Sequence, residues 1–361
     1  MSQALREIQA AAGASFITSD PGSVPASFGN EAIATAALHN GVALCDRSHW
    51  GRLQVSDADR QRYLHNQTTN DIQTLKPGQG CDTVFVTSTG RTIDLVTAYV
   101  LDDSVLLLTS PNRRQALMQW MDRFIFFADK VAIADLTDTT VAFSLIGPQS
   151  QALLTQLGAT HLGTDYASHA IAILGAGEAA AGETTGVETR IAVGSGLATP
   201  GYTLIASAAD AATLWQTLTQ AGAVPFGETL WEQLRIEQGR PAPDHELTED
   251  VNPLEAGLWH TISLSKGCYI GQETIARLHT YRGVKQQLWG IALAAPVAPD
   301  SLIVANDEKV GTLTSCIQTP DGVLGLGYIR TKAIAAGLTT VTVADQPGTL
   351  VALPFISHDY L

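Results

Sequence analysis

The chain has 361 residues, of which 35 are Asp or Glu and 21 are Lys or Arg, so its formal net charge is -14. This length suffices for two or three domains with a sizeable core. The acidic balance argues against nucleic acid and anionic membranes as partners, because both are bound through a basic face. Residues 1–14 lack a signal-peptide pattern, and no apolar run is long enough to span a bilayer. We therefore expect a cytoplasmic protein.

The four cysteines, Cys45, Cys81, Cys268 and Cys316, lie far apart, and none belongs to a Cys-x-x-Cys pair or a Cys/His ligand pair. This spacing argues against a closed zinc site or a four-cysteine iron–sulfur site, so we predict no metal site. Disulfides are not expected in a reducing compartment.

The amino-terminal part gives few structural signals. Residues up to about 40 are rich in Ala, Gly and Ser, and Asp20-Pro21-Gly22 is a turn signal. The first firm segment is 43–55, and Ser56–Asp59 resembles a capping box that opens a helix. In chain order, the patterns then predict a strand at 82–87 and a strand-rich run at 92–109 that is interrupted by the turn pair Asp102-Asp103. They predict a helix that opens at Ser110-Pro111 and carries Leu117, Met121, Phe124 and Ile125 on one face. Strands at 131–136 and 141–146 and a helix ending at Gly158 follow.

The second half continues this mixture and then changes in texture. Strands are expected at 170–174, 190–193 and 202–206, and helices from about 208 to Gly222 and up to Gly239. From Gly290 onward, short alternating runs are separated by turns at Asn306-Asp307, Asp321-Gly322 and Gln346–Gly348, the pattern of a small antiparallel β-barrel. We predict an α+β protein with parts at 1–135, 136–283 and 284–361.

The stretch Lys266–Glu273 places one cysteine, Cys268, between Gly267 and Gly271, ahead of a segment expected to be helical. Glycine lets the backbone approach a ligand closely. A thiol before a helix start and near a lysine is expected to be more nucleophilic than usual. The alternative is that Cys268 is a small buried apolar residue, the common fate of a single cysteine. The pattern alone leaves both interpretations open.

Segments along the chain together point to a family. They are Leu44–Gly51, Gly90–Asp94, Leu234–Pro241, Asn252–Leu258 and the octet Lys-Gly-Cys-Tyr-Ile-Gly-Gln-Glu at 266–273. They resemble the glycine-cleavage T-protein, the folate-dependent aminomethyltransferase. The octet resembles the signature of its YgfZ-type branch, tetrahydrofolate-binding relatives tied to the synthesis or repair of iron–sulfur enzymes.

The resemblance implies three domains in a ring-like arrangement around a folate pocket, with a carboxy-terminal β-barrel. It implies a tetrahydrofolate-binding protein that supports iron–sulfur enzymes, with folate and those enzymes or their assembly factors as partners. A folate-dependent aminomethyl- or demethylating transferase and a non-catalytic, folate-regulated adaptor are the alternatives. Two departures argue against T-protein chemistry: Leu95 follows Asp94 where a second aspartate often stands, and Ser195–Tyr202 lacks a pterin-binding glutamate.

The resemblance also implies the site residues. The catalytic candidates are Cys268, Lys266, which would stabilise the thiolate, and Asp94. The folate-binding candidates are Asp94, Arg235, Glu255, Tyr269, Gln272 and Arg277.

Each of these assignments has a plainer alternative. A group of basic residues, Lys266, Arg277, Arg282 and Lys285, is suited to bind the glutamate tail of folate. The alternative is that these residues belong to a solvated helix face with pairs such as Glu273 and Arg277. Asp94 either faces a pocket or caps a turn. Asp46–Ser48 could be a structural network.

The aromatic and histidine residues also leave alternatives open. The tryptophans at 50, 231 and 259 are candidates for the core or for a pocket wall. Single histidines such as His49, His65, His260 and His279 are more often surface or hydrogen-bonded residues than catalytic bases.

Overall fold

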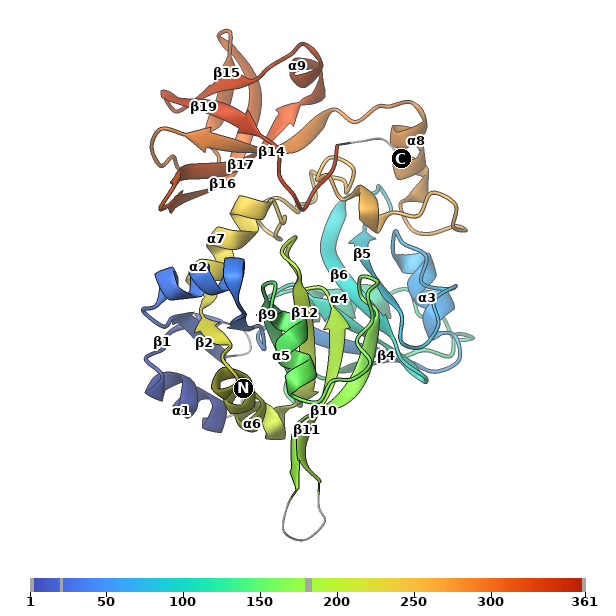
Figure 1. Cartoon of the computed structure of the whole chain (residues 1–361). Helices are drawn as coiled ribbons and strands as arrows, with labels where there is room; N and C mark the ends of the chain where they lie inside the picture. Colours follow the sequence, from blue (N-terminus) through green and yellow to red (C-terminus); the bar gives the residue numbers. More distant parts are fainter. Residues whose placement is uncertain (1–2, 20–21, 179–183, 359–361) are drawn as a thin grey trace. The chain divides into compact units, whose positions relative to one another are not determined.

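The computed structural model describes residues 3–19, 22–178 and 184–358 (Figure 1). The turn predicted at Asp20-Pro21 lies outside the described residues. The chain forms two compact units, described separately below. The first comprises residues 1–63, 72–81 and 97–231, and the second comprises 64–71, 82–96 and 232–361. The three-part division drawn from the sequence texture stays a prediction.

Four elements that the sequence patterns did not reveal lie near the amino terminus. They are α1 (Gln3–Ala11), β1 (Ser15–Ser19), β2 (Gly22–Ser27) and α2 (Glu31–Asn40). Leu5 of α1 is fully buried in the core of the first unit. The Ala-rich composition conceals these helices, because Ala does not mark a buried face as Leu or Ile would.

A six-stranded sheet forms the centre of the first unit. Its strand order is β10-β11-β12-β9-β3-β13, antiparallel except for the parallel pair β13 and β3. The strands are β3 (Ala43–Asp46), β9 (Thr140–Ile146), β10 (His169–Glu178), β11 (Thr184–Val193), β12 (Gly201–Ser207) and β13 (Val224–Phe226).

Two of the predicted helices of the first unit, α5 (Ser150–Gln156) and α6 (Ala211–Gln220), each bury one face in the core of that unit. Helix α6 buries Leu214, Trp215 and Leu218, and α5 buries Leu153 and Leu154. The Trp215 ring lies 5.4 Å from the Phe143 ring in an edge-to-face contact, a geometry that aromatic pairs favour.

A second sheet has the strand order β5-β6-β7-β4-β8. Residues 82–86 and 92–96 of its first two strands belong to the second unit. The strands are β4 (Gly51–Ser56), β5 (Gly80–Val86), β6 (Thr92–Val100), β7 (Ser104–Thr109) and β8 (Ala132–Asp135), and α3 (Arg60–Gln67) follows β4.

One helix boundary was predicted wrongly. Helix α4 spans Arg114–Asp122, so the predicted start at Ser110-Pro111 is too early, and Phe124 and Ile125 lie beyond its end. Asn112 has a φ of 60°, in the left-handed region, which prevents a helix from running through it.

Apolar side chains of the second unit form separate cores, one among the barrel strands and one that includes Tyr269 of the octet. Val84, Val86 and Leu95 pack there with Tyr269 and Ile275. The helices are α7 (Glu228–Gln238), whose first turn belongs to the first unit, α8 (Gln272–Thr280) and α9 (Thr331–Ala335).

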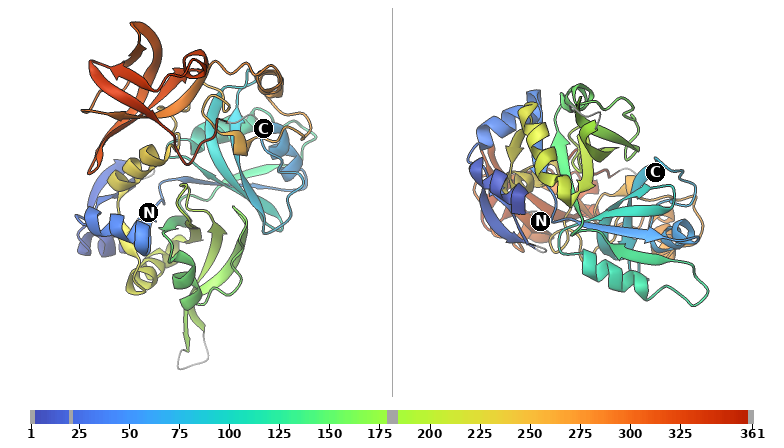
Figure 2. Two further views of the ribbon diagram at one scale, coloured as in Figure 1. Left: turned by 45° about the horizontal axis from the view of Figure 1, so that its top comes forward. Right: turned by 90° about the horizontal axis from the view of Figure 1, so that it is seen from below.

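The carboxy-terminal strands close into a six-stranded barrel, as the alternating runs predicted (Figure 2). The turns at Asn306-Asp307 and Asp321-Gly322 are confirmed. The turn predicted at Gln346–Gly348 is wrong, because Ala344 and Asp345 have positive φ and β19 begins at Gln346. The barrel strands are β14 (Gln286–Leu293), β15 (Leu302–Ala305), β16 (Glu308–Thr319), β17 (Gly322–Arg330), β18 (Thr340–Val343) and β19 (Gln346–Val351).

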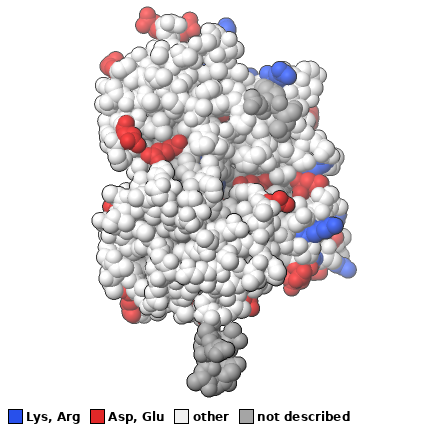
Figure 3. All heavy atoms as spheres, viewed as in Figure 1, with Lys and Arg blue, Asp and Glu red and all other residues white. Residues whose placement is uncertain are grey.

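One face of the molecule carries few charged side chains, in small separate groups (Figure 3). Figure 3 shows one face on which acidic and basic side chains are scattered over a largely uncharged surface. Among the described helices, none is long and apolar enough to cross a membrane.

Candidate functional site

The octet forms a loop that leads directly into α8. Gly271 has a φ of 80° and lies at the amino end of this helix. A Cβ on Gly271 would lie 2.6 Å from the Thr87 carbonyl oxygen and 2.9 Å from Gly90 Cα. Only glycine permits both this backbone conformation and this close approach. The second glycine of the motif therefore packs the octet against the turn that contains Gly90.

Lys266 is buried, and its ammonium group is engaged by the protein itself. Its Nζ donates hydrogen bonds to the carbonyl oxygens of His65, Thr68 and Asn70 at 2.5 to 2.7 Å. It also lies 4.7 Å above the ring of Tyr269. The His65 carbonyl belongs to the last turn of α3, where carbonyls lack helical partners and attract a cation. This geometry gives Lys266 a structural role, and its predicted role toward the thiolate stays a prediction.

Cys268 is exposed, whereas Cys45 is buried and Cys81 and Cys316 are half-buried. Burial raises the pKa of the Cys45 thiol well above its ordinary value, with Glu228 and Asp46 adding to the shift. Cys268 is thus not the small core residue that the alternative interpretation described. Among the described residues, no group of three or more His, Cys, Asp or Glu is arranged to hold a metal ion.

The other octet candidates occupy different environments. Tyr269 is buried, and burial raises the pKa of its hydroxyl. Gln272 opens α8, with its N–H donating to the Tyr269 carbonyl at 3.2 Å. Arg277 is exposed in the last turn of α8, where a cation also interacts favourably with the helix dipole.

Asp94 lies within β6 and is fully buried, so it does not cap a turn. Its neighbour Leu95, at 1 % exposure, packs in the apolar core. The second aspartate of the T-protein loop is therefore replaced here by a core residue. A carboxylate at position 95 would be buried in that core.

Glu255 takes part in a reciprocal cap of the turn at 252–255. Its Oε2 accepts from the Asn252 N–H at 3.1 Å, and Asn252 Oδ1 accepts from the Glu255 N–H at 3.0 Å. Burial raises the pKa of Glu255, opposed by the Asn252 N–H and by the Arg91 guanidinium, 3.7 Å away. The Glu255 carboxylate therefore orders the Asn252–Leu258 segment, whether or not it also contacts a ligand.

Arg235 is buried and paired within the second unit. It donates to Glu232, to Glu246 at 2.8 Å and to the Ser315 hydroxyl at 3.0 Å. Burial acts to lower the pKa of Arg235, but the two carboxylates outweigh it and the net shift is upward. Its charge is therefore balanced by the protein.

All eight predicted site residues lie in the second unit. Lys266 and Tyr269 are in direct contact, while Arg235 and Glu255 are each occupied by separate networks. The sequence interpretation missed Asp71 and the proximity of His65 to the octet, because His65 was treated as an isolated residue. The sequence signal for this pair was limited to the position of His65 and Asp71 on either side of the 66–70 segment.

The Asp46–Ser48 segment is structural, as one interpretation proposed. Asp46 accepts from the Ser48 N–H at 2.9 Å, and the Arg47 guanidinium lies 4.0 Å from the Trp50 ring and 4.9 Å from the Trp231 ring. Both tryptophans belong to the core of the first unit. The Ser195–Tyr202 loop, which lacks a pterin-binding glutamate, contains Gly196. A Cβ at position 196 would lie 2.1 Å from Arg47 Nη1, so this position requires a glycine.

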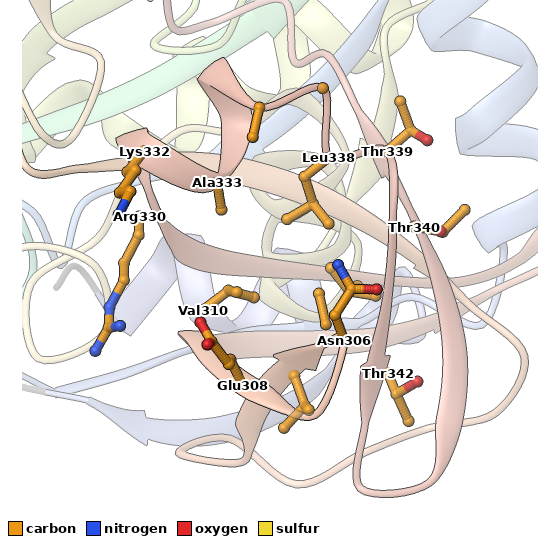
Figure 4. Close-up of a pocket in the computed structure, with 15 residues that line it drawn as sticks. Asn306, Glu308, Val310, Arg330, Lys332, Ala333, Leu338, Thr339, Thr340 and Thr342 are labelled. Carbon is orange, nitrogen blue, oxygen red and sulfur yellow. The ribbon is translucent and has the colours of Figure 1, made fainter.

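A surface groove of about 720 Å³ lies on the barrel, between β15, β16, β18 and α9 (Figure 4). Arg330 and Lys332 stand at one end, and Thr340 and Thr342 at the other. None of the predicted site residues lines this groove. It therefore offers no support for the predicted folate site.

The GCVT N-terminal domain model matches residues 5–266. This chain belongs to the GCVT N-terminal domain family. Among its family relatives, "Putative transferase At1g60990, chloroplastic" of Arabidopsis thaliana is 44% identical over 337 residues, which cover 92% of this chain and 76% of the relative. An aminomethyltransferase of Listeria monocytogenes is 28% identical over 302 residues, which cover 82% of this chain and 80% of that protein.

A solved structure confirms the fold of this GCVT family member. The glycine cleavage system aminomethyltransferase T from Bartonella henselae matches with a TM-score of 0.83 at 18% identity, covering 100% of this chain and 99% of that one. The predicted α+β, aminomethyltransferase-like fold with a carboxy-terminal antiparallel barrel is therefore correct. The chain has the fold of this aminomethyltransferase T.

Proposed function

We propose that this GCVT family member is a tetrahydrofolate-binding protein that supports the synthesis or repair of iron–sulfur enzymes, with Cys268 as its reactive thiol. The exposure of Cys268 on a loop anchored at both ends carries the proposal. A thiol held in this way is available to a ligand or client, which a buried structural cysteine is not. The cytoplasmic location stays part of this proposal.

The donor set of the second unit is chemically suited to folate. Arg277, Arg282 and Lys285 are exposed and lie within or just after α8, where they would attract the carboxylates of a glutamate tail. Asp94 supplies a carboxylate of the kind that pairs with an aminopterin ring. Bound folate would carry the one-carbon unit, while these side chains would bind and orient it.

A second candidate is a folate-dependent aminomethyl- or demethylating transferase. The names of the Arabidopsis and Listeria relatives favour it. Two positions count against it, because each lacks the carboxylate that T-protein chemistry is expected to need. One is Leu95, which packs in the core, and the other is the Ser195–Tyr202 loop, whose Gly196 lies against Arg47. Turnover of a methylamine-type substrate by the purified protein with tetrahydrofolate would establish this alternative.

The proposal is tested in cells that lack this protein, by measuring iron–sulfur enzyme activity after returning Cys268→Ala or wild type. We expect wild type to restore the activity and Cys268→Ala to restore little of it. Cys316→Ala is the matched control and should restore activity, because Cys316 is a half-buried barrel residue. Full restoration by Cys268→Ala would remove any chemical role for this thiol and leave the non-catalytic adaptor.

A further inference from the structure

His65, which is buried, and the half-buried Asp71 form a pair beside the octet. Nδ1 of His65 lies 3.1 Å from Asp71 Oδ1, with the two side chains 8% and 29% exposed. A carboxylate close to one imidazole nitrogen favours a ring orientation in which the other nitrogen, Nε2, can act on a neighbour. Among the hydrogen bonds of the described residues, none involves His65 Nε2.

His65 Nε2 lies close to the backbone of the Cys268 loop. A Cβ built on Gly267 would lie 3.8 Å from His65 Nε2, and it would meet no other heavy atom within 4 Å. Because residue 267 is a glycine, no side chain stands between the imidazole and the loop. Cys268 is the next residue, and consecutive Cα atoms are about 3.8 Å apart.

Two hydrogen bonds hold this loop on the segment that carries His65. Lys266 Nζ donates to the His65 carbonyl on one side of Cys268, and the Ile270 N–H donates to the Asn66 carbonyl at 2.9 Å on the other. The backbone on both sides of Cys268 is therefore held beside the segment that carries His65. Contact can be direct or through one water, as in many ligand-free thiol–imidazole pairs.

We propose that His65, oriented by Asp71, is the proton acceptor that converts the Cys268 thiol into a nucleophile. In this step the S–H bond breaks, an N–H bond forms at Nε2, and the electron pair remains on sulfur. The imidazolium then carries a proton that it can return to a leaving group. This pair suits electrophiles whose leaving group is protonated as it departs.

The charges around His65 agree with this role. Burial lowers its pKa first, the Lys266 ammonium adds to that effect, and Asp71 opposes both, so the net shift is downward. The imidazole is then neutral near neutral pH and able to accept a proton. Once the transfer has occurred, the nearby Asp71 carboxylate balances the charge of the imidazolium.

The experiment measures alkylation of each cysteine by iodoacetamide across a range of pH, by peptide mass spectrometry on the folded full chain. For His65→Gln we expect Cys268 to react about tenfold more slowly near neutral pH and the profile to shift to higher pH, since a thiol without a base is mostly protonated there. Asp71→Asn should show a smaller change in the same direction. Cys316 in the same samples and the exposed His161→Gln variant are controls expected to match wild type.

Equal rates and identical pH profiles for Cys268 in wild type, His65→Gln and Asp71→Asn would overturn the proposal. If His65→Gln fails to fold, as shown by faster Cys45 labelling, the profile of Asp71→Asn decides the question alone. The inference rests on the proposed role of Cys268 as a reactive thiol, but it is measured without folate or clients. Absence of folate binding would therefore end the proposed function but would not affect the measured role of His65. Equal alkylation rates would overturn the role of His65 but would not affect folate binding.

Discussion

Lys266 shows at the scale of one residue how a buried side chain can hold a loop in place. Its three hydrogen bonds to the 65–70 segment fix the start of the octet and, with it, the position of Cys268. The sequence suggested a lysine acting on the thiolate, and the structure gives its Nζ three carbonyl acceptors. An ammonium so bound can still contribute its field, but its largest contribution is to the stability of the loop.

Replacing Lys266 by Met should therefore destabilise the protein. Three buried carbonyls would lose a charged donor, and we expect a loss of about 3 kcal/mol in the free energy of unfolding. Urea denaturation measures it, with the exposed Lys309→Met as the matched control, for which the change should stay within about 0.5 kcal/mol. A Lys266→Met midpoint equal to wild type would show that these bonds contribute nothing.

At the scale of elements, His169 at the start of β10 contacts strands of two different sheets. Its Nε2 lies 3.0 Å from the Val100 carbonyl at the end of β6, and its Nδ1 lies 2.9 Å from Arg190 Nη1 of β11. Arg190 can only donate, so the ring must be neutral with its proton on Nε2. Burial and the Arg190 charge lower the pKa of His169 from 6.5 to about 4.

This depressed pKa makes stability depend on pH. Above about pH 6.5 the contribution of neutral His169 to the free energy of unfolding is fully present. It is lost as the pH falls toward about 4, because the unfolded state takes up the proton first. We expect a loss of about 2 kcal/mol on going from about pH 7.5 to about pH 5. His169→Gln should lack this part of the dependence in urea denaturation at both pH values. Parallel losses in variant and wild type would assign the effect to other groups.

At the scale of the whole molecule, the parts with strong local patterns were the ones the sequence predicted. The alternating runs of β15 to β18 and the Leu214, Trp215 and Leu218 face of α6 are set by local burial, and they are confirmed. Helices α1 and α2 were missed because Ala marks no face, and α4 begins later than predicted because Asn112 is left-handed. Family resemblance, and not local pattern, gave the overall fold.

The site was only partly predictable for a physical reason. The octet is contiguous, so its glycine and cysteine could be recognised together, and the exposure of Cys268 agrees with a functional thiol. Its link to His65 spans 201 positions between Lys266 and the carbonyl that it binds. No periodicity of one segment reports such a contact, and only the folded chain brings the two segments together.

The measurement that tests the central claim most directly is titration calorimetry with tetrahydrofolate on wild type, Asp94→Ala and Cys268→Ala. We predict that wild type binds, that Asp94→Ala binds at least about tenfold more weakly through loss of a charged hydrogen bond, and that Cys268→Ala keeps its affinity. Circular dichroism of Asp94→Ala checks that the variant is folded. Absence of any binding by folded wild-type protein would contradict the account.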